Sequence, residues 1–136
     1  MRNALLIYTA SSLAAGAYHS WSNQHAKLNA EMDTTQQLAF TSQLIAQGIL
    51  NAGKGTAIYG VGSFLLAAVF FGNLVCVTMP LETWNKNHTK ITWLLSNAIG
   101  ISATAATLSY GAFKFGDGAM DIGQAIMTNA YKTPKF

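Results

Sequence analysis

The distribution of charged side chains constrains this chain more than any other feature of its sequence. Thirteen charged residues among 136 leave four intervals without Lys, Arg, Asp or Glu. A helix needs about 20 residues to cross the hydrocarbon core of a bilayer, and the outer face of a water-soluble helix normally carries frequent charge. The pattern therefore predicts an all-α integral membrane protein, a bundle of about four transmembrane helices. The uncharged intervals are residues 3–26, 34–53, 55–81 and 91–113.

The length of the chain leaves room for a single membrane domain. We expect residues 114–136 to form a tail, because glycines and charged residues replace the apolar pattern there. The apolar residues within 120–127 predict that this tail is a short amphipathic C-terminal arm on the membrane surface. The four predicted spans are residues 3–21, 34–51, 56–79 and 91–113.

The second predicted span differs from the others because amide side chains interrupt it. Gln36, Gln43 and Gln47 fall near one face at helical spacing. This helix either crosses the bilayer with its amide face against protein, or lies along the membrane surface. Its start is marked by the sequence at 33–36, a capping box, and a glycine-rich turn at 51–55 is expected to end it.

Two groups of residues predict contacts with lipid and with other helices. Aromatic rings and lysines collect at bilayer surfaces, so we expect lipid head-group contact at Trp84, Lys86, Lys90 and Trp93. Rows of small residues four apart allow close helix approach. The packing rows that we expect, against each other or against a partner, are Ala68, Gly72 and Cys76 in the third span and Ala98, Ser102 and Ala106 in the fourth, the latter beside a second row at Ser96, Gly100 and Thr104.

Polar residues within the two most apolar spans are few. Asn73 and Asn97 are the side chains most suited to lie at membrane depth, where we expect them to hydrogen bond between helices. The alternative is that they line a small pore.

No constellation of residues predicts catalysis. The three histidines are scattered, and His19 is interpreted as a hydrogen-bonded residue near a span end. The five acidic residues lie in linkers or in the tail. The segment 48–56 resembles a phosphate-binding loop but has Gly55 where Ser or Thr must follow the lysine. The sequence therefore predicts no enzyme activity, no metal site, no cofactor and no nucleic-acid partner, with a bound structural phospholipid as a compatible ligand.

The first span ends in Gly16-Ala17-Tyr18-His19. This segment, followed by a polar linker, a less apolar helix and two strong spans, resembles the transmembrane protein 256 and DUF423 family of small four-helix membrane proteins. In that family a glycine follows the histidine, where this chain has Ser20. The resemblance spans about residues 5–113 and implies a four-helix topology without an established activity.

Taken together, these features predict an accessory, structural subunit of a multi-subunit membrane complex. The setting we expect is the respiratory chain of the mitochondrial inner membrane, with other membrane subunits and lipids as partners. The alternative is a small stand-alone transporter or channel component. With four spans, five cations share the side of both termini and three lie opposite, so the positive-inside rule places the termini on the matrix or cytoplasmic side.

Overall fold

All regular secondary structure in the described part of the chain is helical. The computed structural model describes residues 2–29 and 31–131, and over these residues the predicted all-α class is confirmed. The elements are α1 (Arg2–Asn29), α2 (Thr34–Val77), the single turn α3 (Leu81–Trp84) and α4 (Asn87–Tyr131).

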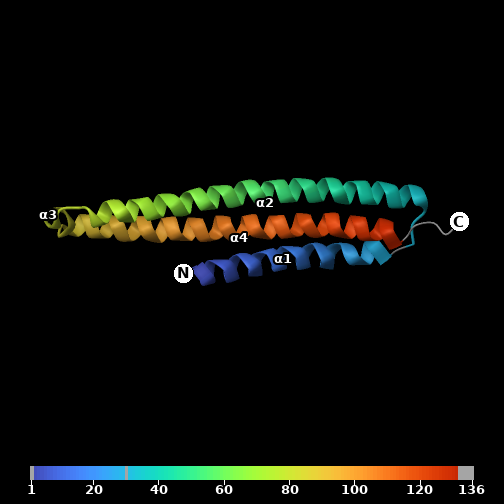
Figure 1. Ribbon diagram of the computed structural model, residues 1–136, viewed down its shortest axis with the longest axis horizontal. Coiled ribbons are helices and arrows are strands. Elements are labelled where there is room, and N and C mark those ends of the chain that lie inside the picture. Colours follow the sequence, from blue (N-terminus) through green and yellow to red (C-terminus); the bar gives the residue numbers. More distant parts are fainter. Residues whose placement is uncertain (1, 30, 132–136) are drawn as a thin grey trace.

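The three long helices form one elongated layer in which α4 lies between α1 and α2 (Figure 1). The helix α2 runs antiparallel to α4 through the tight connection that contains α3. The helix α1 runs parallel to α4, since Tyr8 contacts Ala105 and Ser20 contacts Asp121. Because α1 covers only part of α4, the molecule has a two-helix end at α3 and a three-helix end opposite (Figure 1).

The start of α2 is fixed by its sequence. Asp33 accepts a hydrogen bond from the Gln36 backbone N–H at 2.7 Å, and the Gln36 side chain accepts one from the Asp33 N–H at 3.3 Å. This reciprocal pair satisfies two N–H groups that no helical carbonyl can reach. The predicted capping box is confirmed.

The predicted turn at 51–55 is wrong, because α2 continues through it as one helix of 44 residues. Its glycines serve close packing instead of chain reversal, and no described glycine has a positive φ. A Cβ added at Gly55 would lie 2.4 Å from the backbone N of Phe115 and 2.6 Å from the carbonyl of Gly111. The predicted spans 34–51 and 56–79 are therefore two halves of α2.

The predicted surface arm is also wrong, because α4 continues to Tyr131 in a helix of 45 residues. Glycines that weaken an isolated helix here allow neighbouring backbones to approach. A Cβ at Gly118 would lie 2.4 Å from the Gly48 carbonyl, and one at Gly116 would lie 2.2 Å from the Leu13 carbonyl. The last residues of the predicted arm, 132–136, lie outside the described residues.

The contact between α2 and α4 repeats every seven residues, the period of a left-handed helix pair. Gly48, Gly55 and Gly62 of α2 face Gly111, Gly118 and their neighbours on α4. Small residues at this seam bring the helices together but bury few large side chains. Among the described residues, the buried apolar ones are Leu44, Leu108, Ala112 and Ala125.

Within residues 2–29 and 31–131, two helices are long and apolar enough to cross a membrane. They are α2 over Thr34–Val77 and α4 over Asn87–Thr128. The helix α1, which contains the predicted span 3–21, does not meet this criterion of length and hydropathy.

Candidate functional site

A buried polar cluster joins all three long helices at the three-helix end. Asp117 of α4 is its centre and has 5% of its surface exposed. One carboxylate oxygen lies 3.1 Å from His19 Nδ1 of α1, and the other accepts a hydrogen bond from the Asn51 amide of α2 at 3.2 Å. Lys114 approaches the second oxygen at 3.9 Å. A single carboxylate thus ties α1 and α2 to α4.

One helical turn further along α4, Asp121 makes a second tie to α1. The Ser20 hydroxyl donates to Asp121 Oδ1 at 2.5 Å. The same hydroxyl lies 3.2 Å from Gln124 Oε1, a second acceptor. One hydroxyl hydrogen serves one acceptor at a time, and the shorter distance is the one to Asp121.

The contacts of this cluster hold the three long helices together. Ser20, Asp121 and Gln124 have 2%, 4% and 5% of their surfaces exposed, so breaking their contacts leaves polar groups without water. Within residues 2–29 and 31–131, no group of three or more His, Cys, Asp or Glu side chains is placed to hold a metal ion. The geometry supports fixed docking of α1.

The sequence did not identify Asp117 and Asp121 as site residues, because they lie within the segment interpreted as a surface arm. With Gln124 and Thr128 they follow one another at spacings of three or four, which forms a polar stripe on one helical face. That stripe is the signal from which their shared contact could have been found. His19 is hydrogen bonded, to Asp117 and to Asn23, as its sequence position predicted.

A second polar network lies between α2 and α4 at the two-helix end. The Asn73 amide donates to Asn97 Oδ1 at 2.7 Å, and Trp93 Nε1 donates to Asn73 Oδ1 at 2.9 Å. The Asn97 amide donates to the Trp93 carbonyl at 3.0 Å. The prediction of hydrogen bonding between these two helices is confirmed.

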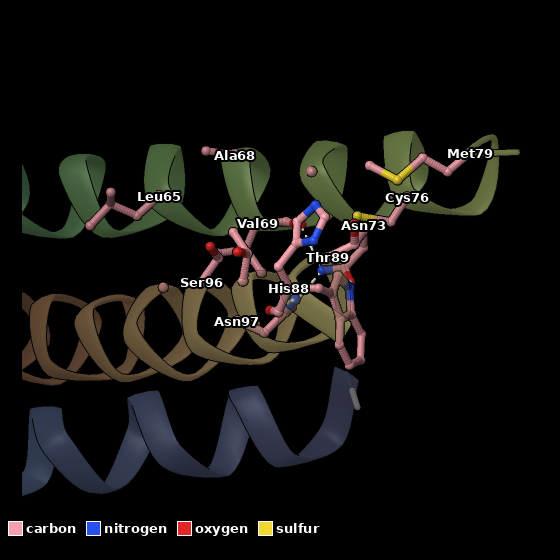
Figure 2. A pocket seen from close by; sticks show the side chains of 14 residues that line it. Leu65, Ala68, Val69, Asn73, Cys76, Met79, His88, Thr89, Ser96 and Asn97 are labelled. Carbon is pink, nitrogen blue, oxygen red and sulfur yellow. Dashed lines mark hydrogen bonds between the residues drawn. The ribbon is translucent and has the colours of Figure 1, made fainter. Parts of the chain in front are cut away.

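A groove opens beside this network between α2 and α4 (Figure 2). Its volume is about 570 Å³, within the range of about 300–1,000 Å³ typical of ligand sites. Gly72 on α2 and Gly100 on α4 line it, together with Asn73 and Asn97, and His88 points into the same space. The walls are otherwise mostly small or apolar.

The four residues predicted to contact lipid head groups gather around this end. Trp84 of α3 packs edge-to-face on Trp93 of α4, with ring centroids 5.6 Å apart. Lys86 and Lys90 are exposed on either side of the start of α4. The structure thus brings together residues that the sequence placed at one membrane surface.

The predicted packing rows do not meet each other. In one row Ala68 and Gly72 are exposed, Cys76 is half-buried and all three border the groove, while Ala98, Ser102 and Ala106 are exposed on α4. The second predicted row of α4 packs between the helices instead. Its Thr104 is buried, and a Cβ on its Gly100 would lie 2.6 Å from a Val69 methyl group of α2. The expectation that Ala98, Ser102 and Ala106 face a partner stays a prediction.

Comparison with protein-family models, curated proteins and solved structures gives no significant match. The resemblance to the transmembrane protein 256 and DUF423 family therefore stays a prediction.

Proposed function

We propose that this chain is a non-catalytic structural subunit of a multi-subunit membrane complex. In this proposal only the apolar halves of α2 and α4 cross the bilayer. Two belts of residues support that placement. Trp84 and Trp93 mark one surface, and Lys54 and Lys114 mark the other, with Tyr59 and Tyr110 close by.

The spacing of the belts matches a bilayer. At about 1.5 Å per residue, α4 rises about 30 Å between Trp93 and Lys114, which is the thickness of the hydrocarbon core. The antiparallel register brings Lys54 to nearly the same height as Lys114, because Asn51 contacts Asp117 and Gly55 faces Phe115. Both helices thus change from apolar to polar at one level.

The main observation in support of the subunit proposal is apolar surface outside the bilayer, beyond the level of Lys54 and Lys114. Past Lys114, α4 continues for about 25 Å, and Ile126 and Met127 are 61% and 57% exposed. On α2, Leu38 and Ile49 are 65% and 61% exposed beyond Lys54. In the proposed placement lipid tails do not reach these side chains, and contact with a protein neighbour would remove them from water.

The position of Arg2 supports a protein neighbour as well. The register of α1, with Tyr8 opposite Ala105, continues to place Arg2 near the height of Ile99, inside the level of Trp93. A cation at that depth requires a protein or aqueous neighbour.

We further propose the mitochondrial inner membrane and its respiratory chain as the setting. Two crossings place Lys27, Lys54 and Lys114 at the three-helix end and Lys86 and Lys90 at the other. By the positive-inside rule the three-helix end then lies on the matrix or cytoplasmic side. The connection through α3 lies on the opposite side.

Partner purification tests the proposal. The tagged full-length chain is solubilised gently and its size is measured on a native gel. We expect migration in a complex far larger than its own 14.5 kDa, and release of the chain by Ile49→Lys but not by the control Gln47→Lys, since Gln47 is already polar and exposed. Migration as a monomer or small homo-oligomer would contradict the proposal, and solute flux in liposomes would favour the transporter alternative.

A further inference from the structure

We propose that the groove between α2 and α4 binds one acyl chain of an anionic phospholipid, with its head group beside Lys86, His88 and Lys90. This inference rests on the proposed membrane crossing. It assigns a ligand to one defined site on the chain.

The lining of the groove suits a hydrocarbon chain. Leu65, Ala68 and Val69 line it, and Gly72 leaves space where another residue would place a side chain, since a Cβ there would meet nothing within 4 Å. The amide groups of Asn73 and Asn97 are hydrogen bonded to each other and to Trp93. These two amides therefore need no polar ligand.

The mouth of the groove suits a phosphate group. His88 and Thr89 line the groove at the start of α4, and Lys86 and Lys90 flank them. Neither lysine forms an ion pair within the described part of the chain. The single acid nearby is Glu82 of α3, so the lysines leave this end positively charged, which complements an anionic head group.

The lining and the charge of the groove favour a phospholipid over a partner helix, because a mostly apolar wall below a positively charged mouth matches hydrocarbon tails below an anionic head group. Met79, just after the end of α2, and His88 of α4 border the groove (Figure 2). Trp93, which packs edge-to-face on Trp84, also lines the groove, and aromatic rings collect at the depth where a head group gives way to its tails.

Lipid retention by the purified full-length chain tests this site. Native mass spectrometry compares phosphatidylglycerol with phosphatidylcholine of identical acyl chains. We expect a preference of about tenfold for phosphatidylglycerol, lost in the double variant Lys86→Gln and Lys90→Gln. Gly72→Leu, whose Cβ meets nothing within 4 Å, should lower retention of both lipids roughly tenfold, the effect of about two methylenes excluded from the groove.

The matched control is Gly60→Leu, also on an open face of α2 with nothing within 4 Å of its Cβ, which should retain lipid as the unmodified chain does. Equal binding of both lipids, or full retention by Gly72→Leu, would overturn the assignment. Loss of a co-purifying protein from Gly72→Leu with lipid retained would overturn it too, because a partner would then occupy the groove. The subunit proposal fails by a different measurement, the native size of the complex.

Discussion

Ser20 of α1 and Asp121 of α4 are joined by a hydrogen bond of 2.5 Å, and both residues are at least 95% buried. They lie far apart in the sequence, so the bond fixes how α1 docks on α4. Further along the same contact, Ser12 and Ser109 lie 3.0 Å apart. Polar pairs of this kind hold α1 in register, since few large apolar side chains are buried there.

Replacing Ser20 by Ala is expected to loosen α1. The Asp121 carboxylate would lose its donor while staying buried, at a cost of about 1–3 kcal/mol. For a chain of this length we expect the midpoint of thermal unfolding in detergent to fall by about 5 °C or more. The control is Ser11→Ala, whose side chain is exposed and whose loss should leave the midpoint unchanged. Equal midpoints for the two variants would show that the Ser20 bond does not stabilise docking.

Substitution of two glycines of α2 by alanine is expected to change the stability of the chain in opposite directions. Gly55→Ala should destabilise the chain, because its methyl group would meet the backbone of Phe115 and Gly111 and separate the helices. Gly60→Ala should stabilise it by about 0.5–1 kcal/mol, since Gly60 has open space around it and alanine favours the helix. Thermal unfolding of both variants measures the difference. A neutral Gly55→Ala would contradict the close packing at Gly55, and a destabilising Gly60→Ala would contradict the open space at Gly60.

The same glycines explain why the sequence predicted helices but not their lengths. Lys54 between two glycines has the composition of a turn, and only the position of Gly111 across from Gly55 shows that the glycines serve contact. The start of α2 was predictable because Asp33 and Gln36 interact locally. The Asn73 to Asn97 bond was also predictable, since both residues are polar exceptions in apolar segments.

The burial of the two carboxylates could not be predicted from the local sequence pattern. Asp117 lies between two glycines and Asp121 follows them closely, and a charged residue is normally exposed. Their burial depends on His19, Ser20 and Asn51, which come from two other helices. Tertiary contacts of this kind determine the three-helix end, and composition does not reveal them.

The network of Asn73, Asn97 and Trp93 is expected to couple α2 to α4 at membrane depth. A double-mutant cycle with Asn73→Ala and Asn97→Ala isolates the pair. We expect a coupling free energy of about 0.5–2 kcal/mol in favour of the intact pair. Asn73→Ala should also shift the fluorescence of Trp93, whose indole N–H donates to Asn73. Additive effects of the two substitutions would mean that the bond contributes nothing to stability.

Labelling of single cysteines distinguishes two crossings from four. The chain has one native cysteine, Cys76, so Cys76→Ser provides the background for Ala26→Cys, Lys54→Cys and Asn85→Cys, all at exposed positions. With two crossings, a membrane-impermeant maleimide should label residues 26 and 54 from the same side and residue 85 from the other. With four crossings, residue 26 would be labelled together with residue 85 instead, because a span would separate it from residue 54. Residue 26 therefore decides the topology, since the positions of residues 54 and 85 are common to both arrangements.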